Sequence, residues 1–243
     1  MSPRRIPPVL LVFLLLAGTV LATAYSLRYE RAEADRRSAR EGERAAAVIS
    51  LSMTLAGESL DDVAGLFDAS AGVDADEFAA FGHRVLGSSG LSAVGWVERV
   101  RAADRARHEA RTGRAIVEPS PTGVRRAGDR AAFYPVAHSA SDLSTGTVLG
   151  LDEAAEPVRR AALDAAVAGG SAVVTPPVRL YGSGQAGLLL YQPVYRGGGT
   201  PALPAARESR LAGFVVGAYR LDALMRSTSA AIISGLPVEV RDG

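Results

Sequence analysis

The chain of 243 residues has no cysteine, no lysine and only three histidines. Without cysteine it cannot form disulfides, thiolate metal sites or a thiol nucleophile. All 27 basic residues are arginine, which we attribute to the coding bias of a GC-rich genome. The three histidines, His83, His108 and His138, are 25 and 30 residues apart and match no local metal-binding motif. The sequence therefore predicts neither a metal site nor a cofactor.

Concentrated charge and catalytic motifs are also scarce. The formal net charge is +1, and the arginines are interspersed with acidic residues, so no basic stripe predicts a nucleic-acid partner. There is no G-x-S-x-G elbow, and Gly182-Ser183-Gly184 lacks the lysine and the following helix of a phosphate loop. We therefore expect no catalytic residue. A hydrolase with residues dispersed along the chain is kept as a minor alternative.

One long uncharged run is present, from Val9 to Leu27, directly after Arg4 and Arg5. As a helix, this run would reach about 28 Å, close to the ~30 Å hydrocarbon core of a bilayer. Residues 1–28 are therefore predicted to anchor the chain in the inner (cytoplasmic) membrane, with the N-terminus inside and the remainder extracytoplasmic. The alternative is a signal peptide cleaved after Ala22-Thr23-Ala24, which would release a secreted or periplasmic binding protein.

A helical pattern continues beyond the apolar run. Residues 28–56 place apolar side chains on one face at 3- and 4-residue steps, Gly57 weakens the pattern, and Ser59 is a candidate N-cap for a second piece that ends near Ala69. Residues 29–71 are accordingly predicted to form a stalk helix, and a homodimer is expected to assemble through it.

The rest of the chain mixes short strands with helices, which predicts an α+β fold. Helices are expected from a cap at Asp74 to about residue 87 and over 103–111, 155–168 and 221–231. Strands are expected over 91–100, 115–118, 133–137, 172–174, 186–195 and 211–219, with a loop over 197–209. The Asp242-Gly243 ending of a strand-like run over 237–243 is typical of a hairpin turn, so further chain is expected to follow.

Polar and aromatic residues interrupt the strands between residues 133 and 195. Because they lie among glycine and small apolar residues, they have the composition of a cavity in which a few polar groups orient a small ligand. An alternative interpretation is a hydrophobic core with tyrosines at its rim. The residues concerned are Tyr134, Arg179, Tyr181, Tyr191, Gln192 and Tyr195.

Several short segments occur in an order and at a spacing that resemble the CHASE domain, an extracytoplasmic sensor of histidine kinases and of nucleotide and diguanylate cyclases. The resemblance covers roughly residues 72–225. The segments that carry it are Phe78 and Phe81, Gly95–Val100 with Arg105 and Glu109, Phe133–Ala137, Leu149–Glu153, Glu156–Gly170, Thr175–Leu180 and Leu190–Tyr195.

The resemblance implies two PAS-like subdomains, a membrane-distal one over 72–196 that binds the ligand and a membrane-proximal one that starts within 197–243. It also implies a second transmembrane helix and a cytoplasmic output domain, which are expected to follow after residue 243. The chain itself would be a sensor and not an enzyme. Its parent would be a histidine kinase or, less favoured, a diguanylate cyclase.

The resemblance also bears on the ligand. Plant cytokinin receptors of this family bind the adenine ring through an acidic residue, and that position falls on Arg159 in this chain. Their backbone and threonine contacts fall on Tyr181 and Tyr191. The opposite charge of Arg159 argues against a cytokinin. Because a guanidinium group suits a carboxylate or phosphate, we expect a small anionic ligand.

Overall fold

The computed structural model describes residues 42–67, 73–141 and 148–234. The predicted membrane anchor at 1–28 and the predicted strand at 237–243 lie outside these residues. Within the described part of the chain, no helix is both long and apolar enough to cross a membrane.

The centre of the molecule is an antiparallel sheet with the strand order β6-β1-β10-β9-β7, in which β8 also pairs with β9. The two longest strands, β9 and β10, lie next to each other in the sheet. The bounds of its strands are Ala93–Glu98 (β1), Val136–Ser141 (β6), Val173–Val174 (β7), Val178–Arg179 (β8), Ala186–Tyr195 (β9) and Leu211–Arg220 (β10).

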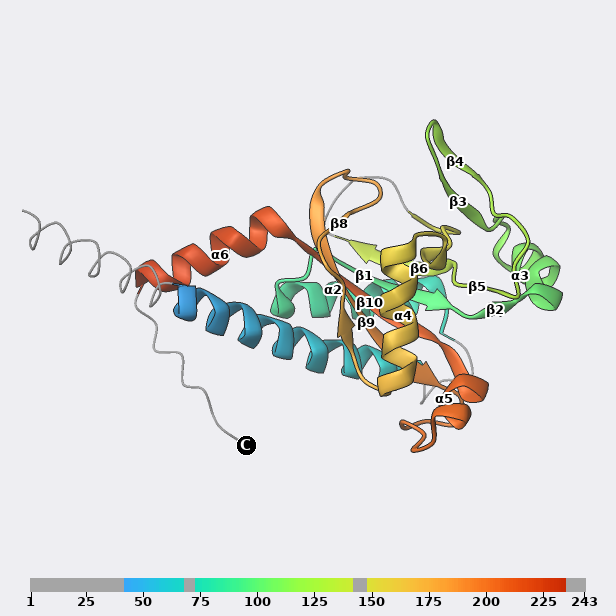
Figure 1. Ribbon diagram of the computed structural model, residues 1–243, viewed down its shortest axis with the longest axis horizontal. Helices are drawn as coiled ribbons and strands as arrows, with labels where there is room; N and C mark the ends of the chain where they lie inside the picture. Colours follow the sequence, from blue (N-terminus) through green and yellow to red (C-terminus); the bar gives the residue numbers. More distant parts are fainter. Residues whose placement is uncertain (1–41, 68–72, 142–147, 235–243) are drawn as a thin grey trace, which may run out of the picture.

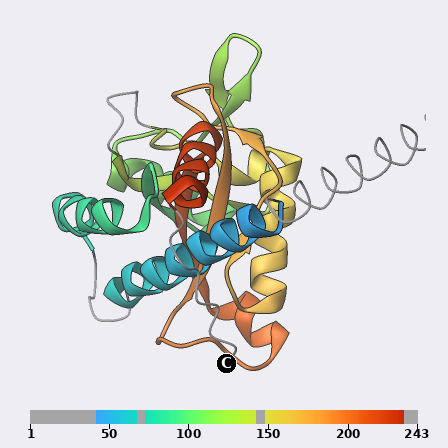
Figure 2. The ribbon, with the colours of Figure 1, turned by 90° about the vertical axis from the view of Figure 1, so that its left-hand side faces the viewer.

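Three helices cover one face of this sheet, namely a helix over residues 42–67, α2 (Ala75–Ser89) and α6 (Leu221–Ser234). The helix over 42–67, called the N-terminal helix below, runs obliquely across the strands (Figure 2). It packs Ala56, Leu60 and Val63, all fully buried, into one apolar cluster with the alternate residues of β1, β9 and β10 that face it.

The helix α4 (Pro157–Gly169) covers the other face, where Leu163 and Ala166 pack on Tyr191 and Phe214. A short turn of 3-10 helix, η2 (Glu153–Ala155), leads into it, and a short helix, α5 (Pro204–Arg210), connects β9 to β10. Pro157 at the helix start and Gly170 at its C-cap, with φ of 71°, set the ends of α4.

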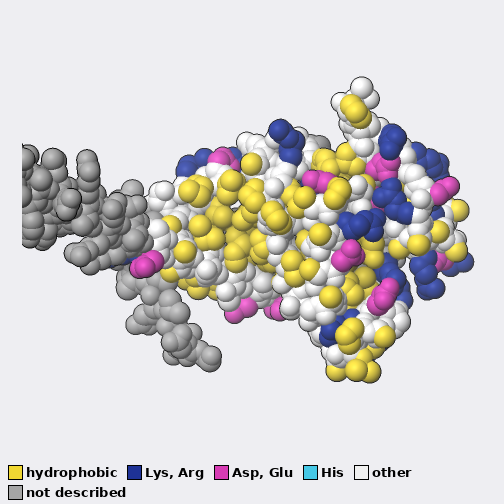
Figure 3. All heavy atoms as spheres, viewed as in Figure 1, with side chains coloured by type: hydrophobic (Ala, Val, Ile, Leu, Met, Phe, Trp, Pro, Cys, Tyr) yellow, Lys and Arg dark blue, Asp and Glu magenta, His cyan; other side chains and the backbone are white. Residues whose placement is uncertain are grey.

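A smaller, arginine-rich unit projects from the opposite end of the molecule to the N-terminal helix and α6 (Figure 1). Charged side chains gather at this end, whereas apolar side chains gather over the middle of the face seen in Figure 3. The unit consists of β2 (Val100–Arg101), η1 (Ala102–Asp104), α3 (Arg105–Thr112), the hairpin of β3 (Val117–Ser120) and β4 (Gly123–Arg126), and β5 (Ala132–Phe133), which pairs with β2.

The predicted α+β class is confirmed, and most predicted elements are found within one or two residues of their predicted ends. The Asp74 side chain does cap α2, because it accepts a hydrogen bond of 2.8 Å from the Glu77 amide. The predicted loop over 197–209 was wrong in part, because this segment contains most of α5.

The predicted restart of the stalk helix at Ser59 is wrong. The helix continues through Gly57, and the Ser59 hydroxyl donates to the Leu55 carbonyl at 2.8 Å, inside the helix. Burial of Ala56, Leu60 and Val63 against the sheet outweighs the helix penalty of one glycine, which is about 1 kcal/mol.

The subdomain boundary predicted between residues 196 and 197 falls inside the central sheet. It separates β9 from β10, which pair along most of their length, and β10 also pairs with β1. Residues 211–220 therefore form the middle strand of the same layer to which residues 93–98 and 186–195 belong.

Candidate ligand-binding site

A cavity of about 210 Å³ lies on the α4 face of the sheet. Gly95 is part of its wall, and a Cβ atom added there would come within 3.1 Å of Val216 and 3.3 Å of the His138 carbonyl, so a larger residue does not fit at this position. The cavity is lined by Ser92, Ala93, Val94, Gly95, Val136, Ser139, Ser141, Val148, Glu153, Arg159, Leu180, Tyr181, Ser183, Leu189, Val216 and Ala218.

Arg159 forms one side of the cavity from the first turns of α4. It is buried, with 2% of its surface exposed. Its Nη1 donates to Glu153 Oε2 at 2.5 Å and its Nε to Glu156 Oε2 at 2.8 Å. Its Nη2 donates to the Arg179 carbonyl at 2.9 Å, and its guanidinium carbon lies 4.1 Å from the centre of the Tyr181 ring. The guanidinium is thus held on three edges and one face.

Glu153 is the acceptor at the centre of this group. Its Oε2 accepts from Arg159 and also from the Tyr191 hydroxyl, at 2.6 Å, although Tyr191 is 38 residues away in sequence. Burial raises the pKa of Tyr191 well above its usual value, and the Glu153 charge adds to this rise. Tyr191 therefore acts as a neutral hydrogen-bond donor to a buried carboxylate.

The same charges act on Arg159 and Tyr181. Burial alone would lower the pKa of Arg159, but the charge and hydrogen bond of Glu153, together with Tyr191 and Tyr181, outweigh burial and raise it. Burial raises the pKa of the Tyr181 hydroxyl, which Arg159 opposes and Glu156 reinforces. The Arg159 guanidinium therefore keeps its charge between the carboxyl groups of Glu153 and Glu156.

The structure separates the five residues predicted for the site. Arg159 and Tyr181 line the cavity, and Tyr191 lies behind them and supports Glu153. The half-buried Tyr134 instead packs its ring 5.8 Å from that of Phe214. The Arg179 side chain points to the exposed Gly184 carbonyl at 2.9 Å, and only its backbone contacts Arg159.

Sequence reasoning missed the two carboxylates, Glu153 and Glu156, as well as the serines of the cavity wall. Both acids occur in the segments that carry the family resemblance, and Glu156 is three residues before Arg159, a spacing typical of a helical ion pair. This spacing was the available signal for Glu156, whereas the contact with Glu153 depends on the turn before the helix.

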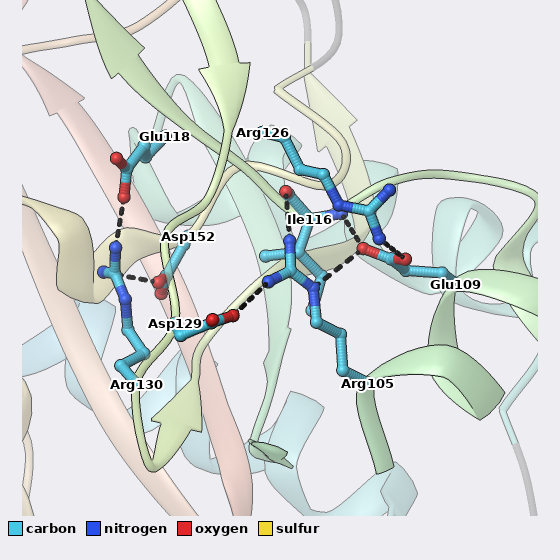
Figure 4. A network of polar contacts seen from close by, with 8 residues as sticks. All are labelled: Arg105, Glu109, Ile116, Glu118, Arg126, Asp129, Arg130 and Asp152. Atoms are coloured by element: carbon cyan, nitrogen blue, oxygen red, sulfur yellow. Dashed lines mark hydrogen bonds and ion pairs between the residues drawn. The ribbon is translucent and has the colours of Figure 1, made fainter. Parts of the chain in front are cut away.

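That turn is held by Asp152, whose side chain is fully buried. Its Oδ1 accepts from the amides of Tyr134, at 2.8 Å, and of Ala154, at 3.2 Å. Its Oδ2 accepts from Arg130 at 2.9 Å, and Arg130 also pairs with Glu118 (Figure 4). Burial raises the pKa of Asp152 even though these donors oppose the rise. The arginine network of the small unit thereby fixes the turn that presents Glu153.

The sequence matches the CHASE domain over residues 71–243, and the chain therefore belongs to the CHASE domain family. The family is a sensory one and not a catalytic one, and its members are extracytoplasmic parts of membrane receptors. No curated protein shows significant similarity to the chain.

Among solved structures, the chain is similar to the ligand-binding domain of the amino acid chemoreceptor PctC of Pseudomonas aeruginosa PAO1 in complex with GABA. The two are 15% identical with a TM-score of 0.45. The match covers 77% of this chain and 63% of the chemoreceptor domain, so the chain spans less than two thirds of that domain.

Proposed function

We propose that the chain is the ligand-binding module of a transmembrane receptor, and that a small molecule in the cavity on the α4 face is its signal. The observation that carries the proposal is the position of this cavity in a CHASE domain. Val216 and Ala218 of β10 line the cavity on one face of the sheet, and Tyr219 of the same strand contacts the N-terminal helix on the other.

A bound ligand can shift this helix only if it binds one arrangement of β10 more tightly than another. In the proposed receptor the helix continues to the anchor predicted at 1–28, and a cytoplasmic histidine kinase or diguanylate cyclase responds to its position. A second, membrane-proximal PAS-like subdomain belongs to the same proposal, but the strand over 211–220 is part of the ligand-binding sheet and not of that subdomain. Assembly as a homodimer along the N-terminal helix is supported by Leu51 and Leu55, which are 45% and 49% exposed on it.

The binding experiment uses the full chain in detergent, with thermal unfolding measured against a library of amino acids, organic acids and purines. We expect at least one compound to raise the melting temperature. Ala218→Leu, which fills the cavity from β10, should abolish that shift, and Ala161→Leu on the exposed side of α4 should leave it intact. A library without any hit, or a hit that binds Ala218→Leu equally well, contradicts the proposed function.

The secreted alternative is kept because Ala22-Thr23-Ala24 is a suitable cleavage site. Mass spectrometry of the mature protein from the cell envelope distinguishes the two. The receptor proposal requires the intact N-terminus in the membrane fraction, and cleavage after Ala24 with release of the chain contradicts it.

A further inference from the structure

We infer, on the basis of the proposed function, that the ligand carries a cationic hydrogen-bond donor, such as a protonated amine, and that this group binds the Glu153 carboxylate. The expected anionic ligand at Arg159 would meet an arginine whose charge is already compensated. Two observations carry the inference, namely the charge balance at this side of the cavity and the unused oxygen of Glu153.

The charge balance follows from the contacts of Arg159. Its single positive charge faces the two carboxylates of Glu153 and Glu156, which leaves the group one negative charge in excess. An anionic ligand would have to enter beside two carboxylates, and like charges in a partly buried site repel each other strongly. A cationic ligand would instead bring the group to neutrality.

The unused oxygen is Oε1 of Glu153. Both hydrogen bonds to this carboxylate, from Arg159 and Tyr191, go to Oε2, and no group among the described residues donates to Oε1. The only fully covered side-chain polar atoms without a partner in this part of the chain are Arg99 Nε and Tyr195 Oη. Oε1 is therefore not sealed in the core, and it belongs to a residue that lines the cavity.

Because Oε1 belongs to the cavity wall and has no donor among the described residues, a ligand amine can donate to it in place of water. A charged donor would make the strongest contact of this kind. The rigid support of Glu153 by Arg159 and Tyr191 means that the oxygen is already in place when the ligand arrives.

The other residues of the cavity wall indicate the size and polarity of the part of the ligand beyond its amine. Val136, Leu180, Leu189 and Val216 supply an apolar surface, and Ser139 adds a hydroxyl. Benzene fits an apolar cavity of about 150 Å³, so the cavity of about 210 Å³ has room for one ring or a short branched chain with an amine attached. The chemical class is therefore a small amine with an apolar body.

Three probes of nearly equal size test this class on the full chain in detergent, with affinity measured by titration calorimetry. They are phenethylamine, phenethyl alcohol and phenylacetate, which present a cation, a neutral donor and an anion on the same ring. We expect phenethylamine to bind at least about ten-fold more tightly than phenylacetate, and phenethyl alcohol to have an affinity between the two. This ranking needs no variant, so it remains decisive even if a variant fails to fold.

Glu153→Gln then assigns the preference to the carboxylate. The variant should lose about ten-fold in affinity for phenethylamine and little for phenethyl alcohol, whereas Glu208→Gln removes an equal charge from the exposed surface of α5 and should change neither. Equal or tighter binding of phenylacetate, binding of none of the three probes, or an amine preference that survives Glu153→Gln overturns the inference. The library experiment with Ala218→Leu judges the proposed function separately, because a library hit of any charge still supports it.

Discussion

The hydroxyl of Tyr219 in β10 donates a hydrogen bond to the backbone carbonyl of Ser52 in the N-terminal helix, with 3.1 Å between the two oxygens. The same hydroxyl lies 2.9 Å from the carbonyl of Ser89, the last residue of α2. Ala218, one residue earlier in β10, lines the cavity on the opposite face of the sheet. Tyr219 is therefore a direct contact between the strand beneath the ligand and the helix that would carry the signal.

Removal of this hydroxyl should destabilise the fold. We expect Tyr219→Phe to lower the free energy of unfolding by about 1–2 kcal/mol, because two carbonyls lose a shared donor inside the protein. Tyr195→Phe is the matched control. The Tyr195 hydroxyl is buried without a partner among the described residues, so its loss should cost nothing. Urea denaturation of both variants tests this prediction. Equal stability of the two variants and the wild type would mean that the Tyr219 hydroxyl contributes nothing and that only the rings matter.

The change in the free energy of unfolding at alkaline pH should also depend on Tyr219. Burial raises the pKa of Tyr219 to about 12 in the folded chain, whereas an unfolded tyrosine ionises near pH 10. The unfolded chain therefore loses this proton first. The stabilisation from Tyr219 should be complete below about pH 10 and be lost progressively as the pH rises from about 10 to about 12.

This loss can be isolated by measuring unfolding at a pH of about 8 and again at about 11. The wild-type chain should lose more stability between the two than Tyr219→Phe, so the difference between them should shrink. Burial also raises the pKa of Tyr134, Tyr181, Tyr191 and Tyr195, but these groups are present in both proteins and cancel. A constant difference across this range would mean that the Tyr219 hydroxyl ionises as an unfolded tyrosine does.

The course of the N-terminal helix shows what local sequence could not predict. Gly57 and Ser59 have the local preferences of a helix interruption, and both are overruled by the burial of Leu60 and Val63 on a sheet whose strands come more than thirty residues later. The strands β9 and β10, by contrast, were predicted almost to the residue. Their long runs of apolar and β-branched residues are specified locally, because both faces of these strands are buried.

Two glycines of α2 should respond with opposite sign to the same substitution. A Cβ atom at Gly82 would lie 2.6 Å from the Cβ of Ala140 in β6, whereas one at Gly87 would meet nothing within 4 Å. We expect Gly82→Ala to destabilise the chain by about 1–3 kcal/mol through overpacking. Gly87→Ala should stabilise it by about 0.5–1 kcal/mol through helix propensity. Equal effects on thermal unfolding would show that α2 does not pack on β6 at this distance.

The site was predicted only in part for a related reason. Arg159 could be recognised by its position in a family motif, and its neighbour Glu156 by its spacing. The contact with Glu153 requires a turn whose geometry is set by Asp152, and Asp152 is held by Arg130 and the Tyr134 amide, 22 and 18 residues away in sequence. A free arginine and a neutralised arginine look identical in sequence, and they imply ligands of opposite charge.

The dependence of the site on Arg130 gives the last prediction. Arg130 is the only described side chain that bridges Asp152 and Glu118, and it is 22% exposed. Burial alone would raise the pKa of Glu118, but hydrogen bonds from Arg130 and Arg125 outweigh it and lower the pKa. Arg130→Ala would leave both acids without this partner, and we expect a loss of about 2–3 kcal/mol in the free energy of unfolding.

Arg226→Ala is the control, because Arg226 pairs with the exposed Asp222 on α6 and its removal should leave unfolding unchanged. Arg130→Lys should recover part of the loss, since an ammonium keeps the charge but cannot match the planar fork that reaches two carboxylates. If the turn at Asp152 positions Glu153 as the contacts indicate, Arg130→Ala should also weaken phenethylamine binding at temperatures where the variant is still folded. Loss of stability with unchanged amine affinity would mean that Arg130 supports only the small unit and not the ligand site.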